Sequence, residues 1–322
     1  MKRVLVTGAS GFVGANLTRR LLRDGHEVHL LLRNKSNPWR LADIGGDVQV
    51  HETDVEDRNK VRLLVANISP EWVFHLAAYG AYPAQADGDR MVSTNLGGCL
   101  AMLDACIEAG VGAFVQTGSS SEYGYLDHAA SENEFIQPNS TYAVTKAAAT
   151  YYCQLKARQS GIHAVTARLY SIYGPFEETS RLIPVLLVHA MHGRLPRLVS
   201  PRIARDFVYV DDAVEALLAI AEASQVARGS VYNVCSGVQS TLATAVADVR
   251  ALMNIASEPQ WSSMPERSWD TETWLGSPEA IARDIHWHTR TSFRSGLERT
   301  ASWLRDNPAY MRFYTERIMN QP

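Results

Sequence analysis

A tyrosine and a lysine stand four residues apart in the stretch STYAVTK, at Tyr142 and Lys146. On a helix this spacing places both side chains on one face. The unperturbed pKa of a tyrosine is about 10, too high for a base at neutral pH, but a nearby ammonium can lower that pKa by about 1–3 units. The phenol could then exchange a proton with a carbinol while hydride passes to or from a nicotinamide. A surface pair would share this spacing, so the motif needs support from its surroundings.

Three consecutive serines, Ser119, Ser120 and Ser121, follow an apolar run in the stretch QTGSSSEYG. A serine hydroxyl is too weakly acidic to act as a general base near pH 7 without help. Ser120 and Ser121 can still donate hydrogen bonds to a hydroxyl or keto oxygen of a substrate. Glu122 comes next, and we expect it to cap or contact the following loop. Placed after a parallel strand that ends in serines, the Tyr142–Lys146 pair becomes a strong indication of an oxidoreductase.

A glycine-rich turn, TGASGFVG (7–14), follows the first apolar run and opens a helix. Such glycines let a pyrophosphate rest on the helix N-terminus, where free N–H groups and the helix dipole favour anions. Glycine-rich turns also occur for packing alone, so this motif by itself is weak. The residues that we expect to contact a dinucleotide here are Gly8, Ser10, Gly11, Phe12, Val13 and Gly14.

The end of the second expected strand distinguishes between two cofactors. An NAD site usually has an acid there that binds the ribose 2′-hydroxyl. This chain has Leu32 at that place, followed by Arg33, Asn34 and Lys35. A guanidinium and an ammonium suit a 2′-phosphate, so the sequence predicts NADP(H), with NAD(H) as a possible second cofactor. A solvated basic turn is the alternative.

Further along, two stretches support a dinucleotide site. Asp54, after the third strand, is placed to accept a hydrogen bond from an adenine amino group, and HLAA (75–78) ends the fourth strand in small residues. Helix capping and simple packing would explain each of them separately, but not their joint occurrence in this order. The other cofactor contacts expected from these elements are Val55, Leu76, Ala77, Ala78 and Thr117.

Strands and helices alternate through the first two-thirds of the chain, which predicts a parallel, doubly wound α/β Rossmann sheet. We expect a nucleotide-binding domain over 1–170, to which 203–235 returns, and a smaller interleaved lobe over 171–202 and 236–322. The expected strands are 4–6, 28–32, 48–50, 72–76, 113–117, 163–169 and 231–234, with a strand–helix pair over 206–223. The expected helices include 11–23, one that Pro70 closes, 90–109 and 141–159.

Composition sets the class of protein. The chain has 322 residues, of which 46% are hydrophobic and 20% charged, as is usual for a globular protein. Its net charge is −3, so the charge gives no reason to expect binding to nucleic acid or to acidic membranes. No run approaches a spanning helix, and four scattered cysteines suggest free thiols rather than a disulfide framework or a metal site. The sequence therefore predicts a cytoplasmic protein.

The motifs in their chain order resemble the extended short-chain dehydrogenase/reductases, in the branch that acts on nucleotide sugars. The resemblance covers nearly the whole chain and implies that Ser119 completes a triad with Tyr142 and Lys146. It also implies that Asn95 supports the site and that Tyr170 and Ile172 contact the cofactor. The motifs that carry it are TGASGFVG, HLAA, TNLGG (94–98), QTGSSSEYG, YAVTK, RLYSIYGP (168–175) and RDFVYVDDA (205–213).

The same resemblance assigns the expected substrate, a nucleoside-diphosphate sugar, to the second lobe. Arg205 and Arg267 resemble arginines that clamp the diphosphate, and Trp274 matches a position that controls the room around the sugar. Ser171 stands where most relatives have an asparagine that touches substrate, which loosens any conclusion about the sugar. The further expected substrate contacts are Tyr79, Ser120, Ser121, Arg181 and Leu182.

The three consecutive serines help to decide which reaction the protein catalyses. In the related 4,6-dehydratases the positions of Ser120 and Ser121 hold an acid and a glutamate, so dehydration is disfavoured here. Two reactions remain: reduction of a 4-keto-6-deoxyhexose by NADPH, and 4-epimerisation with a retained cofactor. The basic turn, and the similarity to CDP-abequose/paratose-type synthases, favour the 4-ketoreductase. A catalytically silent NADP sensor is a further alternative. Relatives also commonly form homodimers through the helices expected at 90–109 and 141–159.

Overall fold

The structure is a computed structural model, and it describes residues 1–34, 38–82, 84–265 and 271–320. Its main sheet has seven parallel strands in the order β3-β2-β1-β4-β5-β6-β9. The direction of this order changes between β1 and β4, which is where such sheets bind ligands. These strands are β1 (Arg3–Thr7), β2 (Glu27–Leu32), β3 (Gln49–Glu52), β4 (Trp72–His75), β5 (Ala113–Ser119), β6 (Ala164–Leu169) and β9 (Val231–Val234).

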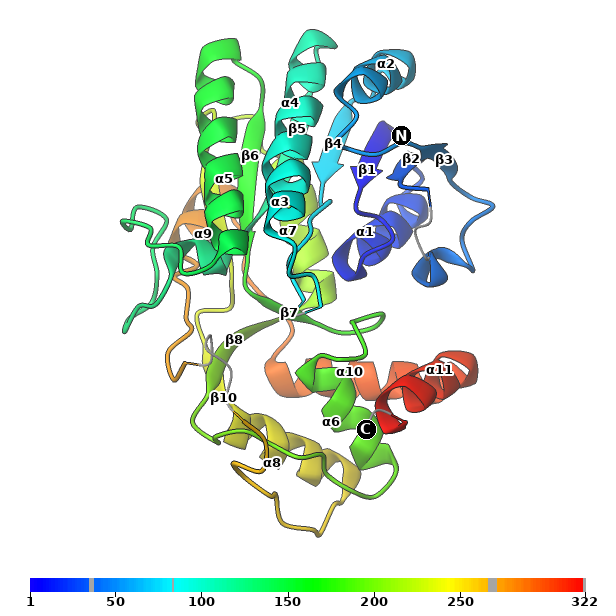
Figure 1. The fold of residues 1–322 in the computed structure, drawn as a ribbon, viewed down its shortest axis with the longest axis vertical. Coiled ribbons are helices and arrows are strands. Elements are labelled where there is room, and N and C mark those ends of the chain that lie inside the picture. The colour runs from blue at the N-terminus through cyan, green and yellow to red at the C-terminus, as the bar shows by residue number, and fades with distance from the viewer. Residues whose placement is uncertain (35–37, 83, 266–270, 321–322) are drawn as a thin grey trace.

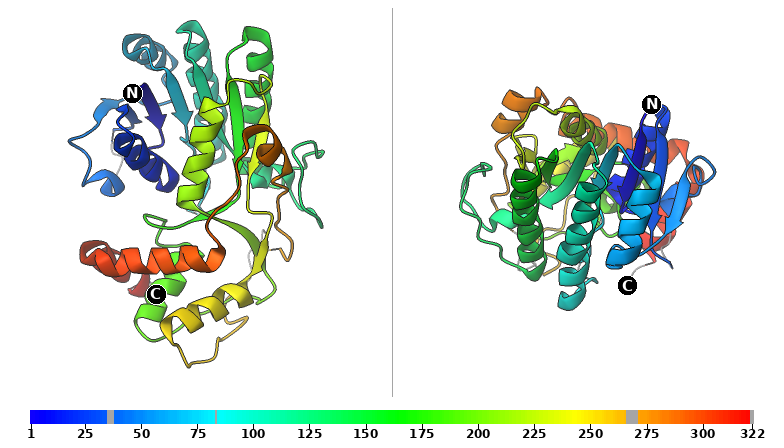
Figure 2. Two further views of the ribbon diagram at one scale, coloured as in Figure 1. Left: turned by 180° about the vertical axis from the view of Figure 1, so that it is seen from behind. Right: turned by 90° about the horizontal axis from the view of Figure 1, so that it is seen from above.

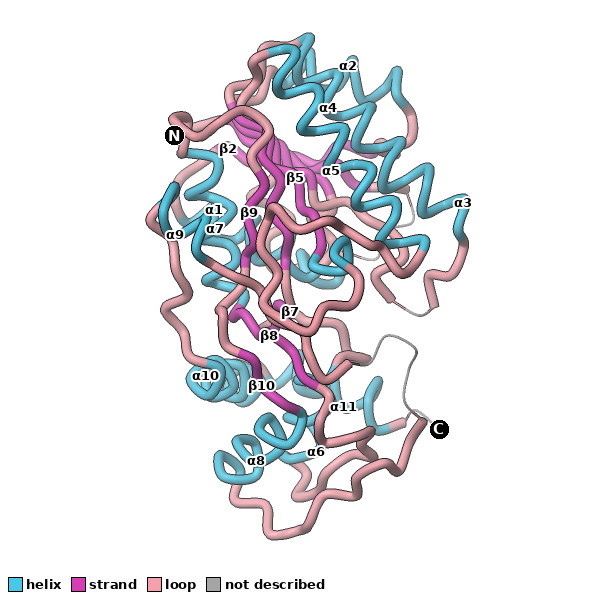
Figure 3. The backbone as a smooth tube through the Cα atoms, turned by 90° about the vertical axis from the view of Figure 1, so that its left-hand side faces the viewer, coloured by secondary structure: helices cyan, strands magenta, loops and turns pink. Residues whose placement is uncertain are grey.

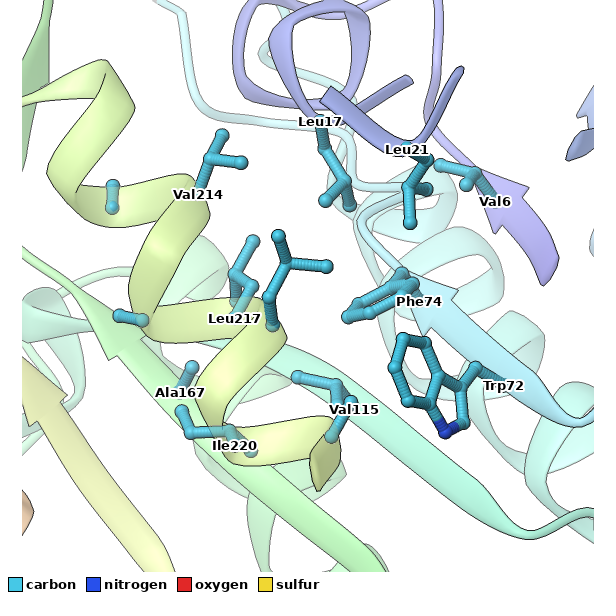
Figure 4. Packing of buried hydrophobic residues seen from close by; sticks show 14 of the residues in the cluster. Val6, Leu17, Leu21, Trp72, Phe74, Val115, Ala167, Val214, Leu217 and Ile220 are labelled. Atoms are coloured by element: carbon cyan, nitrogen blue, oxygen red, sulfur yellow. The ribbon is translucent and has the colours of Figure 1, made fainter. Parts of the chain in front are cut away.

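Helices cover both faces of this sheet, as Figures 1 and 2 show, and the predicted doubly wound fold is confirmed. Each face has its own apolar core. In one of them, Leu17 and Leu21 of α1 and Leu217 of α7 gather around Phe74 of β4, and all four side chains are fully buried (Figure 4). One face carries α1 (Phe12–Arg23), α7 (Val210–Glu222) and α9 (Glu279–Ile285); the other carries α2 (Arg58–Ile68), α4 (Gly98–Glu108) and α5 (Thr141–Ser160).

A second, smaller sheet has the order β10-β8-β7, with β7 and β8 parallel and β10 antiparallel to β8. Figure 3 shows this sheet leading from the main sheet into a lobe of helices. The helices share a core that includes the buried rings of Tyr173 and Tyr314. The elements of the lobe are β7 (Ser171–Tyr173), α6 (Leu182–Met191), β8 (Ala204–Tyr209), β10 (Gln239–Thr241), α8 (Leu242–Met253), α10 (Phe293–Asp306) and α11 (Pro308–Met319).

Two elements differ from the expectation. The helix expected over 90–109 is divided into α3 (Gly88–Met91), a π-helical segment (Val92–Gly97) and α4. The strand that begins the 206–223 pair belongs to the second sheet as β8, whereas α7 packs on one face of the main sheet. The described residues also form two short 3-10 turns, η1 (Trp39–Leu41) and η3 (Ser120–Tyr123). Within the described part of the chain, no helix has the length and apolar character that crossing a bilayer requires.

Candidate functional site

A cavity of about 820 Å³ lies where the two sheets meet. The ends of β1, β4 and β5 and the start of α5 line one side of it, and Arg205 and Trp274 line the side of the second lobe. The positions of these elements can be followed in Figure 1. The cavity thus lies at the carboxyl ends of the parallel strands, beside the change in strand order, as ligand sites of such sheets do.

The glycine-rich turn forms one end of the cavity. Gly8 has a φ of +72°, and a Cβ atom there would lie 2.5 Å from the carbonyl carbon of Leu76, so the turn requires glycine. The amide of Gly11 donates to the carbonyl of Gly8 at 2.9 Å, which closes the turn. No side chain caps the N-terminus of α1, so its first amides are not bound by a capping group. This arrangement suits a bound phosphate group.

Arg33 lies in the wall next to this turn, directly after β2. Its Nη1 atom is buried and has no hydrogen-bond partner within the described residues. A buried guanidinium N–H without an acceptor is unfavourable, and an anionic ligand group would supply that acceptor. Asn34, also predicted to contact the cofactor, is exposed and does not line the cavity, and Lys35 lies outside the described residues.

The predicted triad comes together in the middle of the cavity. Ser119 ends β5, while Tyr142 and Lys146 lie in the first two turns of α5, and all three line the cavity. The Lys146 ammonium donates to the carbonyl of Thr117 at 2.5 Å. This bond fixes the amine at the end of β5, next to the serine stretch.

The protonation of the triad differs from the sequence expectation. Burial raises the pKa of Tyr142 to about 12, although its hydrogen bond with Ser119 acts in the opposite direction. Burial also lowers the pKa of Lys146, and the negative charge of Glu122 partly opposes this. The expected lowering of the phenol's pKa by the ammonium is therefore not found, because removal of the phenol from water has the largest effect on it.

The three serines are tied to their surroundings in different ways. The Ser119 hydroxyl accepts the amide N–H of Ser121 at 3.2 Å, and the Ser120 hydroxyl accepts the indole N–H of Trp274 at 3.1 Å. Trp274 in turn lies against the guanidinium of Arg205, 5.5 Å from the centre of its ring. A hydrogen bond therefore links the serine stretch to the second lobe across the cavity.

The charged side chains along the described cavity wall all have the same sign. Among the described residues that line the cavity there is no Asp, Glu, His or Cys, and the charged side chains are all cationic: Arg33, Lys146, Arg181 and Arg205. Glu122 is fully buried behind the serines, where Arg168 pairs with its carboxylate at 2.8 Å. A cationic wall without carboxylates suits a ligand with several phosphate groups.

Most of the other predicted contacts also line this cavity. They come from the glycine-rich turn, the ends of β4 and β5, and the segment after β6. The second lobe contributes fewer of them, and Arg267 lies outside the described residues. The predicted residues along the wall, besides those discussed above, are Ser10, Phe12, Val13, Gly14, Val55, Leu76, Ala77, Ala78, Thr117, Ser121, Tyr170, Ser171 and Ile172.

Four other predicted residues do not belong to the lining. The carboxylate of Asp54 accepts the amide N–H of Glu56 at 3.1 Å, within its own turn. The Asn95 amide group binds both backbone groups of Tyr79, each at 2.8 Å, and also donates to Thr145 at 2.9 Å.

The aromatic ring of Tyr79 packs against the guanidinium of Arg90, 4.8 Å from the ring centre, and Leu182 packs against the apolar core of the second lobe. Local packing explains why these side chains lie where they do, and their roles as ligand contacts stay predictions.

The structure adds residues to the wall that the sequence did not single out. Tyr82 and Gln85, in the loop after β4, line the cavity, and the Gln85 side chain accepts the amide N–H of Gly80 at 3.0 Å. Tyr125 and Asn139, from the long segment before α5, line it as well. Their loops have no regular spacing, and only the aromatic residues in YGAYPAQ (79–85) could have drawn attention to the first of them.

Comparison with known proteins is consistent with this geometry. A family model described as "NAD dependent epimerase/dehydratase family" matches residues 4–235, which is more than half of the chain. A dTDP-glucose 4,6-dehydratase of Streptomyces griseus is 28% identical over 314 residues, covering 93% of each chain. A crystal structure of UDP-glucose 4-epimerase from Thermus thermophilus in complex with NAD is similar with a TM-score of 0.81 and 27% identity, covering 94% of this chain and 99% of that one.

A longer relative is a trifunctional enzyme of Arabidopsis thaliana, named as a UDP-glucose 4,6-dehydratase, a UDP-4-keto-6-deoxy-D-glucose 3,5-epimerase and a UDP-4-keto-L-rhamnose reductase. It is 24% identical over an alignment 323 positions long, and the alignment covers 96% of this chain and 48% of the relative. The chain therefore spans about half the length of this protein.

Proposed function

Because the chain belongs to the NAD dependent epimerase/dehydratase family, we propose that it is an NADP(H)-dependent 4-ketoreductase of a nucleoside-diphosphate 4-keto-6-deoxyhexose. The observation that carries this proposal is the composition of the cavity wall. Its described charged residues are all cationic, and its best-placed proton donor is the Tyr142 phenol. Such a wall can hold two phosphorylated ligands and move one proton, which is what a reduction needs from the protein.

Arg33 supports the choice of NADP(H). Its buried, unpartnered guanidinium nitrogen lies next to the turn that would hold the pyrophosphate, where the 2′-substituent of the adenosine ribose would be expected. A 2′-phosphate would accept a charge-assisted hydrogen bond there. The relative from Thermus thermophilus was solved with NAD, so NAD(H) is the second cofactor to compare.

The chain's own residues account for the proton side of the reaction. When bound, NADPH supplies a hydride to the carbonyl carbon of the sugar. Ser119 donates a hydrogen bond to the keto oxygen, and Tyr142 gives its proton to the same oxygen, so that the carbonyl becomes a secondary alcohol. The positive charge of Lys146 stabilises the phenolate that remains, and a proton from solvent restores the phenol.

The substrate is expected to lie between the serine stretch and the second lobe. Arg205 and Arg181 would contact the diphosphate, and Arg267, outside the described residues, would join them. Trp274 fills space opposite Ser120, to which it is hydrogen-bonded. The indole favours a hexose without a large N-acyl group, and equal rates with N-acetylated and simple hexoses would contradict that expectation.

The two other reactions of the family need either different catalytic residues or a different cofactor stoichiometry. Dehydration requires an acid and a base at the sugar, and the described wall has serines in place of carboxylates. We therefore do not assign this chain the dehydratase activity for which several relatives are named. Epimerisation at C4 could use the same triad and is the alternative that the relative from Thermus thermophilus favours.

Cofactor stoichiometry tests the proposal. Purified protein with NADPH and the UDP, dTDP or CDP derivative of 4-keto-6-deoxyglucose should consume one NADPH for each alcohol formed. Conversion of UDP-glucose to UDP-galactose without net cofactor change would instead establish the epimerase. Binding of NADPH without turnover of any of these sugars would favour the sensor.

We further propose that the protein works as a cytoplasmic homodimer. The outer face of α5 carries Val144, Tyr151 and Leu155, each more than half exposed, and Val92 lies exposed on the segment before α4. Their spacing along α5 forms one apolar stripe. A second copy would cover this stripe in a symmetric contact, because a two-fold axis brings the same face of both chains together.

A further inference from the structure

Glu122 is a charged residue that the proposed reaction does not use. It lies in η3, directly after the three serines, and its exposed fraction is 0%. It does not line the cavity. An ionised carboxylate with no access to water is costly unless it is paired and hydrogen-bonded, so the surroundings of this one show what holds it.

Three donors from three elements surround the carboxylate. The amide N–H of Ser119 at the end of β5 donates at 2.8 Å, the hydroxyl of Thr150 in α5 at 3.0 Å, and Nε of Arg168 in β6 at 2.8 Å. Arg168 is itself buried, and its guanidinium lies 4.5 Å from the ring centre of Tyr123. Glu122 therefore joins the strand that carries the catalytic serine to the helix that carries the tyrosine and the lysine.

The glycine before the serines leaves space for this carboxylate. Gly118 pairs with Arg168 across β5 and β6. A Cβ atom at residue 118 would lie 2.6 Å from an oxygen of Glu122 and 3.0 Å from Cγ of Arg168. The ion pair passes beneath the strand only because residue 118 has no side chain.

We propose that Glu122 is a positioning residue of the triad: it fixes the backbone of Ser119 and supplies a buried negative charge beneath Tyr142 and Lys146. The role rests on the proposed function of the triad and adds a fourth group to it. The serine is held through its own amide, by a capping box in which the Ser119 hydroxyl and the Glu122 carboxylate each accept a backbone N–H of the same turn.

The electrostatic directions agree with this geometry. The charge of Glu122 raises the pKa of Lys146, against the effect of burial, and it also raises the pKa of Tyr142. Lys146 thereby keeps its proton to a higher pH than burial alone would permit. The other titratable or charged groups that act on Tyr142 or Lys146 are Cys99 of α4, Cys153 of α5, Tyr82 of the loop after β4, and Arg181 before α6. His75 of β4 also faces Lys146, whose charge lowers the pKa of this buried imidazole.

Two variants separate the charge from the geometry. E122Q keeps the length of the side chain and removes the charge, so the alkaline limb of the kcat profile should move to lower pH by about 1 unit, with kcat at the optimum less affected. E122D keeps the charge and shortens the reach to Ser119. It should leave the alkaline limb in place and lower kcat about tenfold to a hundredfold. D212N is the matched control, because Asp212 of α7 is a buried carboxylate that accepts backbone N–H groups of residues 290 and 291. It should leave the limb unchanged.

A measurement that needs no substrate tests this inference independently of the proposed function. Near-ultraviolet tyrosinate absorbance gives the titration of Tyr142 as the difference between a protein and its Y142F derivative. Tyr142 should titrate at lower pH in the E122Q background than in the wild-type background, whichever sugar the enzyme accepts. Identical titrations would overturn the role of Glu122 even if the protein reduces a 4-keto sugar. If E122Q does not fold, E122Q/R168Q is titrated against R168Q, so that the two proteins differ only in the charge at residue 122.

Discussion

At the level of single side chains, the phenol of Tyr142 is the group on which the proposed reaction depends. It lies half-buried in the cavity wall, is hydrogen-bonded to Ser119, and has a pKa raised to about 12, mainly by its removal from water. A raised pKa suits a group that must carry a proton to a keto oxygen. In the oxidative direction the same group would have to lose its proton, which bound ligands and the Lys146 ammonium would have to make easier.

We expect Y142F to lower kcat for reduction by about 10²- to 10⁴-fold, since it removes the proton donor together with its hydrogen bond to Ser119. NADPH binding, followed by fluorescence titration, should change little. Y232F is the control, because the Tyr232 hydroxyl donates to Asp284 at 3.1 Å, away from the cavity. Full activity in Y142F would contradict the proposed mechanism and revive a sensor function.

Arg33 is expected to set the cofactor preference. R33A should weaken NADPH binding by about 10- to 100-fold, because one charge-assisted hydrogen bond is worth about 1.5–3 kcal/mol, and it should leave NADH binding nearly unchanged. The exposed Arg62 of α2 offers a matched control, R62A. A parallel loss of both cofactors in R33A would mean that the arginine supports the fold of the site and does not recognise the 2′-phosphate.

At the level of elements, the start of α5 positions the triad. The Ser140 hydroxyl accepts the amide N–H of Ala143 and caps the helix, so that Tyr142 and Lys146 lie in its first two turns. The hydroxyl of Thr241 caps α8 in the same way, by accepting the amide N–H of Thr244, but α8 lies in the second lobe away from the cavity. The two caps make a matched pair for separating helix stability from catalysis.

Both S140A and T241A should lower the free energy of unfolding by about 1 kcal/mol in urea titrations, as loss of an N-cap usually does. Only S140A should also lower kcat, because fraying of the first turn of α5 displaces the tyrosine. Equal kcat in the two variants would show that packing holds Tyr142 in place without the cap.

At the level of the whole molecule, the junction between the lobes contains an unusual carboxyl group. Glu177 follows β7, and its backbone carbonyl accepts the hydroxyl of Tyr314 from α11 at 2.5 Å. Its Oε2 atom is buried without a partner among the described residues, and burial raises the pKa of the carboxyl to about 8. The nearest cation, Arg181, has its Nε 3.9 Å from the other oxygen.

This group should make the junction less stable in alkali. Because the folded pKa lies above the value of 4.5 of an unperturbed glutamate, the folded state holds the proton more tightly, and stability falls as the pH rises from about 4.5 to about 8. E177Q should remove this dependence and be more stable than the wild type at pH 8, by on the order of a few kcal/mol. E316Q, at an exposed position of α11, should keep the wild-type dependence. Urea titrations at pH 5 and pH 8 measure the free energy of unfolding of each variant. The same change in this free energy between the two pH values for E177Q and for the wild type would exclude the effect.

The proposed dimer gives a second prediction at this scale. L155E places a charge in the exposed apolar stripe of α5 and should convert the dimer to a monomer in light scattering after size-exclusion chromatography, with the far-ultraviolet circular dichroism unchanged. V238E, at another exposed apolar residue in the loop between β9 and β10, is its control. A wild-type protein that is monomeric at micromolar concentration would contradict the proposal directly.

Much of the fold was predictable from the sequence because short apolar runs and helix-length segments alternate regularly. The strand at 231–234 was predicted to the residue, and the helix at 141–159 to within one residue. The helix at 90–109 was not resolved into its parts, since the apolar period passes unbroken through the π-helical segment. Strand β8 was not expected in a separate sheet, because the pairing of strands depends on contacts distant in sequence.

The site shows the same division. Motif order and spacing alone indicated the phosphate turn, the Tyr142–Lys146 pair and the serines, because these depend on local backbone geometry. Burial and the partners of each side chain depend on which elements fold against one another. For that reason only the tertiary structure could reveal the raised pKa of Tyr142, the bond from Trp274 to Ser120, and the carboxylate of Glu122 fixed behind the serine that it follows in the chain.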